Sequence, residues 1–466
     1  MVSILTVMVL IVIFLTLPVC LYFTRNQRDY RVSFTDFKQN FFKNHYYLHV
    51  LGYLVIAFWK GWIDSLNEPM KRITGHWTDL IYAIEGNASL WFQDLLKNEI
   101  LTDVLNFHYL FIYLFLIYVT TVYFAYANDR DMADKVTLNY LLIYCIAVPY
   151  YLFFNVEVTS SWIPGMEALL YHEPVYIDFY VTHDPLDNAV PSLHVAIPFG
   201  ILLLGWLDGK ERGMSLSEYR HYGYMIFVFA NTLIFMISII YLGIHWWIDI
   251  PLGLAVGTIG ALFIHHIQPR LRGLHGGIAW PKEPLRLLAV PILIAGLLSA
   301  AMLATIEAST VDTSMRVGEG EMVYEIIQPF SEDESASTLI TNFDESVVIQ
   351  FVVIELENAP EIMTDRKPDW DSLQNNSIVK LNPGESVLYP HVKTDTWHLI
   401  MVESLTGSMV EVGMVTDYGE TRMLEGWIAS MPSLLITGFV LQRVWQQKAS
   451  SLSLADTRPI PLEEEE

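Results

Sequence analysis

Two stretches of the sequence place histidines where long apolar segments meet polar loops. The first is Pro191-Ser192-Leu193-His194, and the second is His245-Trp246-Trp247-Ile248-Asp249. An ionisable side chain at membrane depth is costly, so its presence indicates a functional site. The four-residue spacing from His245 to Asp249 predicts that both side chains lie on one helical face. The carboxylate would then accept the Nδ1 proton and leave Nε2 free as a nucleophile or base.

The composition favours a membrane protein with several spans. Of the 466 residues, 53% are hydrophobic and 13% are aromatic, which is more than one soluble core requires. The net charge of −24 excludes nucleic acid as a partner, because binding to phosphates needs clustered Lys and Arg. Cys20 and Cys145 both lie within apolar runs. They are predicted to be packed thiols, with no disulfide framework and no metal site.

Apolar runs of about 20 residues predict the membrane spans. Eight are expected, at 2–23, 46–62, 108–126, 138–154, 190–207, 222–241, 246–265 and 285–306, and a shorter ninth at 427–444. Between the second and third, apolar and charged residues alternate over 63–106. This pattern predicts amphipathic helices that lie in the outer interface.

The charges of the loops predict the orientation of these spans. Loops 128–136, 208–221 and 267–286 carry Lys and Arg, whereas loop 156–189 carries neither. Basic loops favour the cytoplasm, so strict alternation places His194 and His245 on the outer side. Pro191 is expected at the start of a helix, where a missing N–H costs nothing.

The pattern of apolar and polar residues changes over residues 307–425. Short alternating segments such as 347–354 and 397–402 are separated by turn signals such as Asn382-Pro383-Gly384. They predict a small antiparallel β-sandwich or barrel. This region holds 23 Asp and Glu residues against 6 Lys and Arg, which indicates a solvated outer domain.

These patterns predict an all-α polytopic membrane protein with a small all-β extracytoplasmic domain near the C-terminus. The expected divisions are two membrane helices (1–62), interfacial helices (63–106), a catalytic membrane core (107–270), a further membrane helix (271–306), the β-domain (307–425), and a final helix with an acidic cytoplasmic tail (426–466).

The two histidine stretches resemble the type 2 phosphatidic acid phosphatase (PAP2) superfamily. Its pattern is Lys-x6-Arg-Pro, then Pro-Ser-Gly-His, then Ser-Arg-x5-His-x3-Asp. The second part is matched except at Leu193, and the third is matched from Ser238 except at Ile239, which replaces the arginine. The first part is missing from 136–190. The resemblance covers roughly residues 100 to 270, in the order of the family's six-helix core.

The resemblance implies a role for each matched residue. His245 would attack phosphorus and form a phosphohistidine, Asp249 would orient it, and His194 would protonate the leaving oxygen. Substrate contacts are expected from Pro191, Ser192, Leu193, Ser238 and Tyr241. Backbone N–H groups at the start of the helix that contains Ser192 and Leu193 would hold phosphoryl oxygens. No cofactor is implied.

The missing cations favour one branch of the family. A site without the Lys and two Arg suits a singly charged phosphodiester better than a dianionic monoester. The pattern is similar to the inositol phosphorylceramide synthases and related lipid phosphotransferases, which implies a membrane lipid donor and an alcohol acceptor.

Two other functions remain open, and a third is disfavoured. One is a phosphatase that acts on phosphatidic acid or on polyprenyl phosphate or pyrophosphate. Another is a catalytically degenerate protein that binds lipid or a partner. A transporter is disfavoured, because no inverted repeat with paired broken helices is found. The oligomeric state has no signal in the sequence.

Several other residues have simpler interpretations. Trp246 and Trp247 are typical of an aromatic belt at the membrane interface. His172 and His183 lie beside acidic residues and could bind metal, but solvated loop histidines are the favoured interpretation.

Overall fold

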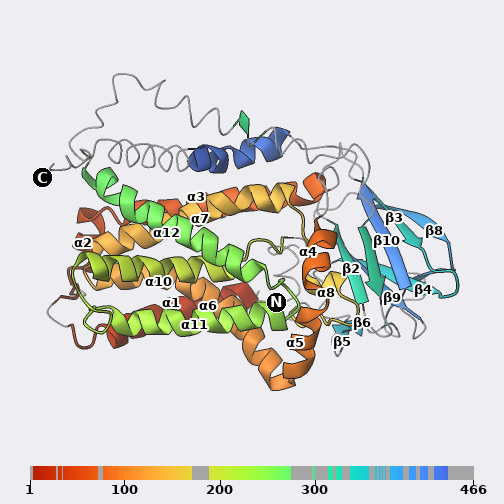
Figure 1. Ribbon diagram of the computed structural model, residues 1–466, viewed down its shortest axis with the longest axis horizontal. Coiled ribbons are helices and arrows are strands. Elements are labelled where there is room, and N and C mark those ends of the chain that lie inside the picture. The colour runs from red at the N-terminus through yellow and green to blue at the C-terminus, as the bar shows by residue number, and fades with distance from the viewer. Residues whose placement is uncertain are drawn as a thin grey trace, which may run out of the picture.

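The protein is mostly helical in the computed structural model, which describes residues 4–27, 30–33, 35–71, 77–170, 188–273, parts of 296–417, and 424–438 (Figure 1). The helices are α1 (Ile4–Phe23), α2 (Phe37–Lys43), α3 (Tyr47–Lys71), α4 (Thr78–Glu85), α5 (Ala88–Leu96), α6 (Glu99–Tyr126), α7 (Arg130–Phe153), α8 (Thr159–Trp162), α10 (Leu193–Glu211), α11 (Tyr222–Tyr241) and α12 (Asp249–Gly273). The long helices form a bundle, and the short helices α4, α5 and α8 gather at one end of it.

Six described helices are long and apolar enough to cross a membrane: α1, α6, α7, α10, α11 and α12. They confirm the polytopic helical class. The apolar part of α3, Tyr47–Ile63, is shorter. Most of the predicted span 285–306 lies outside the described residues. Residues 424–438 are helical, and the ninth span stays a prediction.

Helix α6 begins at Glu99, nine residues before its predicted start at 108. The cause is local, because the side chain of Asn98 accepts a hydrogen bond from the Leu101 N–H at 3.1 Å. Such a cap satisfies one of the unpaired donors of the first turn. The polar residues before the apolar run are therefore helical as well.

The backbones of α10 and α12 lie close together, and glycines allow this approach. A Cβ atom at Gly253 would lie 2.8 Å from the Ser192 carbonyl oxygen, and one at Gly257 would lie 2.5 Å from that of Ala196. Small residues spaced by four are typical of membrane helices in close contact. The contact brings the start of α10 against the first turns of α12.

Alanine at Gly257 is expected to lower the thermal unfolding midpoint of the purified protein. The added methyl group has no space beside the Ala196 carbonyl, and overpacking typically costs about 1–3 kcal/mol. Gly61→Ala is the matched control, because nothing lies within 4 Å of a Cβ there. Equal midpoints for the two variants would contradict the close packing of α10 and α12.

Two of the basic loops used to predict orientation, 128–136 and 208–221, lie at the other end of the bundle. Asp129 accepts hydrogen bonds from Arg212 at 3.1 Å, from His221 at 3.1 Å and from Arg220. Burial favours the neutral acid, but the bonds and charges of His221 and Arg220 outweigh it and hold the pKa of Asp129 below its ordinary value. The cations therefore have carboxylate partners at this end of the bundle.

The C-terminal region forms the predicted small β-domain. Its strands are β1 (Thr313–Val317), β2 (Met322–Ile327), β3 (Ala336–Asn342), β4 (Ile349–Glu355), β5 (Met363–Thr364), β6 (Lys367–Pro368), β7 (Ile378–Leu381), β8 (Ser386–His391), β9 (His398–Ser404) and β10 (Val410–Asp417). Two four-stranded sheets have the orders β1-β10-β3-β8 and β2-β9-β4-β7, and every pairing is antiparallel. A third pair joins β5 to β6.

One sheet packs against the helices as well as against the other sheet. Phe351 and Val402 are fully buried between the sheets. On neighbouring positions, Val352 and Met401 belong to the apolar cluster of the helical bundle. The sheets lie beyond α4 and α8, at the end of the bundle opposite the Asp129 cluster (Figure 1). The β-domain therefore covers the end where α10 and α12 begin.

Candidate functional site

The two predicted catalytic histidines lie at the same end of the bundle. His194 is the second residue of α10, and His245 lies in the turn between α11 and α12. Their ring centroids are 6.5 Å apart. A phosphorus atom about 3 Å from one imidazole nitrogen, with its leaving oxygen about 3 Å from the other, would span a comparable distance.

His245 is held between a carboxylate and a hydroxyl. Its Nδ1 lies 3.0 Å from Asp249 Oδ2, and its Nε2 lies 3.3 Å from Ser192 Oγ. Asp249 is fully buried and His245 is 5% exposed. Since the carboxylate can only accept, Nδ1 carries the proton, and Nε2 accepts from the Ser192 hydroxyl. Nε2 therefore has the lone pair that a nucleophile needs.

The predicted geometry of the His245–Asp249 pair is wrong, although the two side chains do meet. Helix α12 begins at Asp249, so His245 lies in the preceding turn and not on a helical face. The Trp246 N–H donates to Asp249 Oδ2 at 2.9 Å, and this bond folds the turn around the carboxylate. The aspartate thus positions both the imidazole and the backbone of its own loop.

Aromatic rings of α6 and α11 surround His194. It stacks on Tyr109 with a centroid distance of 3.8 Å and an interplanar angle of 20°. Tyr113 lies at 4.0 Å, and Phe235 of α11 lies at 5.6 Å. These contacts restrict the orientation of the imidazole, which a general acid requires.

The segment before His194 presents a helix N-terminus next to His245. Ser192 is the N-cap of α10 and Leu193 is its first residue. Pro191 lies one position before the cap, next to the helix start but outside the first turn. The carbonyl of Pro191 accepts a hydrogen bond from the Tyr151 hydroxyl at 3.0 Å. The free N–H groups of the first turn and the helix dipole favour an anion at this point.

The two remaining predicted substrate residues, Ser238 and Tyr241, form hydrogen bonds within the helical bundle. Ser238 donates to the Phe235 carbonyl at 3.1 Å and is fully buried. The hydroxyl of Tyr241 lies 2.8 Å from that of Thr102, and it accepts from the Asn98 N–H at 3.1 Å. The Tyr241 bonds join the end of α11 to the start of α6, whereas the Ser238 bond lies within α11. They therefore support a structural role for both residues.

Trp246 is part of the protein interior. It is fully buried, and its Nε1–H donates to the Glu157 carbonyl at 2.8 Å. The prediction that it belongs to an aromatic belt is therefore wrong, because a belt residue faces the membrane interface. Its neighbour Trp247 is 39% exposed.

Glu85 of α4 also holds the loop that carries His245, although no sequence pattern marks it as a site residue. Its carboxylate accepts from the N–H groups of Trp247 at 2.8 Å and Ile248 at 2.6 Å. Burial raises the pKa of Glu85, although these two backbone bonds oppose that shift. The short helix α4 thus fixes the backbone of the residues between His245 and Asp249 through hydrogen bonds.

Glutamine in place of Glu85 is expected to lower kcat by about tenfold, as changes to residues that support a catalytic group commonly do. Its NH2 group would face a backbone N–H, so one of the two bonds is lost. KM should change little, because Glu85 acts through the loop. Asp79→Asn, an exposed carboxylate change on the same helix, is the control and should keep wild-type kinetics. Equal kcat values for both variants would contradict the positioning role.

The described residues contain no group of three or more His, Cys, Asp or Glu side chains that could hold a metal ion. His172 and His183 lie outside the described residues. Their predicted solvated state therefore stays a prediction.

Comparison with known proteins gives one match. Residues 164–272 match the model of the PAP2 superfamily, a stretch that includes His194, His245 and Asp249. No curated protein and no solved structure matches the chain significantly. The matched stretch contains α10, α11 and all but the last residue of α12, and these helices bring the two histidines together.

Proposed function

We propose that the protein is an integral membrane lipid phosphotransferase that uses His245 as its nucleophile at the outer leaflet. The proposal rests on the hydrogen bonds of His245 to Ser192 and Asp249, and on the distance of 6.5 Å between the ring centroids of His245 and His194. The PAP2 match supports a lipid enzyme of the phosphatase or phosphotransferase type. The helical bundle supports a substrate that arrives from the bilayer.

The reaction has two steps that share one pair of imidazoles. In the first, the Nε2 lone pair of His245 forms a bond to phosphorus, and the bond from phosphorus to the leaving oxygen breaks. Protonated His194 donates its proton to that oxygen, while Asp249 balances the charge on His245. In the second, an acceptor oxygen attacks phosphorus, neutral His194 takes its proton, and the bond between phosphorus and Nε2 breaks.

A phosphodiester is the proposed donor for reasons of charge, and the alcohol acceptor is proposed because the motif is similar to that of the lipid phosphotransferases. The family's lysine and arginines are replaced or missing, and Arg212 and Arg220 at the other end of the bundle are paired with Asp129. A phosphodiester carries a single negative charge, which the N-terminus of α10 and the Ser192 hydroxyl can stabilise. A dianionic monoester would need more positive charge than this.

The test is turnover by the purified protein of labelled phosphatidic acid and of a labelled phosphodiester phospholipid, each with and without added alcohols. An alcohol-dependent phosphodiester product is expected. Release of phosphate with water alone would make the protein a phosphatase. Absence of both products, with the protein folded, would favour a catalytically degenerate member that binds lipid or a partner.

A further inference from the structure

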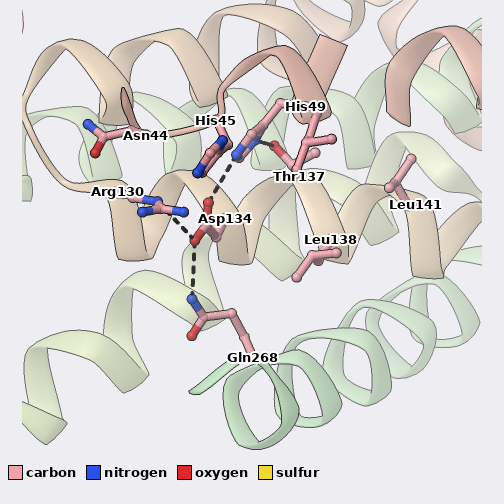
Figure 2. Close-up of a pocket in the computed structure, with 10 residues that line it drawn as sticks. Asn44, His45, His49, Arg130, Asp134, Thr137, Leu138, Leu141 and Gln268 are labelled. Atoms are coloured by element: carbon pink, nitrogen blue, oxygen red, sulfur yellow. Dashed lines mark hydrogen bonds and ion pairs between the residues drawn. The ribbon is translucent and has the colours of Figure 1, made fainter. Parts of the chain in front are cut away.

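A cavity with one polar side lies at the end of the bundle away from the histidines. It has a volume of about 270 Å³ and is bounded by the residues before α3, the first turn of α3, the first turns of α7 and the end of α12 (Figure 2). Gln268 lies 19 positions after Asp249 on α12, which corresponds to about 28 Å along a helix. A hydrocarbon core is about 30 Å thick, so the cavity lies at the opposite membrane boundary from the catalytic site.

A fixed carboxylate organises the polar side of the cavity. Asp134 of α7 lies 2.9 Å from His49 Nε2 and accepts from Gln268 Nε2 at 3.5 Å. The other ring nitrogen of His49 lies 2.8 Å from the Thr137 hydroxyl. Figure 2 shows His49, Arg130 and Gln268 pointing toward Asp134. The arrangement is built by the fold and is not a chance group of surface residues.

Two polar atoms in this arrangement have no hydrogen-bond partner within the described part of the chain. Gln268 is 2% exposed, its NH2 group bonds to Asp134, and its carbonyl oxygen Oε1 is buried without a donor. Nε of Arg130 is also buried without an acceptor, and it is 3.8 Å from Asp134. Unpaired buried groups of this kind are costly. A ligand with an anionic group for Arg130 and a hydrogen-bond donor for Gln268 would satisfy both.

The opposite side of the cavity is apolar. Leu48 of α3 and Leu138 and Leu141 of α7 line it, and Leu48 is exposed on the membrane-facing surface. A polar end next to an apolar wall at a membrane boundary matches the shape of a lipid, whose headgroup and acyl chains differ in the same way. Pockets with basic residues between membrane helices are typical sites for phospholipid headgroups.

We propose that this cavity binds the headgroup of a phospholipid from the leaflet opposite the catalytic site. The phosphate contacts Arg130, and an ammonium or hydroxyl group of the headgroup donates to Gln268 Oε1. The acyl chains lie along Leu48, Leu138 and Leu141. This site is independent of His245 and binds a lipid that is not turned over.

The test is photolabelling of the full chain in phosphatidylcholine vesicles that contain a photoactivatable phosphatidylethanolamine. Labelled peptides should include those that carry Leu48, Leu138 or Leu141. Arg130→Gln and Gln268→Leu should each reduce this labelling at least fivefold, whereas exposed Arg25→Gln at the same end should not. Gln268→Leu keeps the side-chain volume, so it decides the result if Arg130→Gln fails to fold.

Three comparisons separate a phospholipid site from nonspecific labelling and from a site for a soluble headgroup. His245→Ala should leave the labelling of these peptides unchanged, even if the proposed reaction fails. A phosphatidylcholine probe should label them less, because its headgroup has no hydrogen-bond donor. Equal labelling by both probes would overturn the proposed donor contact to Gln268. Unchanged labelling in both cavity variants, or full competition by soluble glycerophosphoethanolamine, would overturn the phospholipid site.

Discussion

Alanine in place of His245 is expected to reduce lipid turnover by about 10⁴-fold or more, which is typical for loss of a nucleophile. No other described side chain offers an imidazole with one nitrogen fixed by a buried carboxylate and the other directed at the start of α10. His194 cannot substitute, because its ring is stacked on Tyr109. The measurement is the rate of product formation from the lipid substrate identified for the wild-type protein.

His245→Asn separates loss of the nucleophile from loss of folding. An asparagine can still donate to Asp249 but forms no stable bond to phosphorus, so turnover should be lost while the unfolding midpoint is largely retained. Wild-type protein quenched during turnover should carry a label that is acid-labile, as expected of a bond between phosphorus and imidazole nitrogen, and the variant should carry none. His266→Ala, an exposed histidine on α12, is the control. Unchanged turnover in His245→Ala would leave a lipid-binding or partner-binding protein.

The class of fold could be predicted because it depends on local composition. The apolar run of 222–241 is the helix α11, and the alternating segment 347–354 contains most of β4. A long apolar run has no other low-energy arrangement in a bilayer, because its backbone must pair within the segment. A short apolar run of this length is likewise consistent with a strand, and β4 is buried on both faces.

The turn that carries His245 could not be predicted from spacing. Gly243 adopts a φ of +81°, and a Cβ there would lie 2.6 Å from the Glu167 carbonyl oxygen. Both facts require glycine at the point where α11 ends. His245 and Asp249 still meet, because the turn leads directly into the first residue of α12. The predicted pairing of the two residues thus rested on a helix that does not extend to His245.

The contact of Glu85 with this turn has no local signal at all. Glu85 is separated in the sequence from Trp247 by 162 positions and from Ile248 by 163. A single glutamate in an amphipathic helix is typical of a solvated face. The packing of α4 against the end of the bundle decides which carboxylates meet backbone donors. The burial of Trp246 has no local signal either, because it depends on segments distant in the sequence, including Glu157.

Asparagine in place of Asp249 is expected to lower kcat by about 10²- to 10⁴-fold, by analogy with loss of the orienting carboxylate in other histidine-dependent sites. Oδ2 of Asp249 accepts from both His245 and the Trp246 N–H, whereas Oδ1 is buried without a partner among the described residues. An asparagine oxygen at the Oδ2 position would keep both bonds. The variant therefore removes the negative charge that stabilises the positively charged phosphohistidine.

Trapping of the intermediate distinguishes Asp249 from His245. Asp249→Asn should still form the labelled phosphoenzyme, but slowly, because Nε2 remains in place. Asp249→Ala should lose both hydrogen bonds, and it should lower the unfolding midpoint as well as the rate, since a buried backbone N–H loses its acceptor. Exposed Asp94→Asn on α5 should match the wild type. A full rate in Asp249→Asn would mean that hydrogen bonding alone, and not charge, prepares His245 for attack.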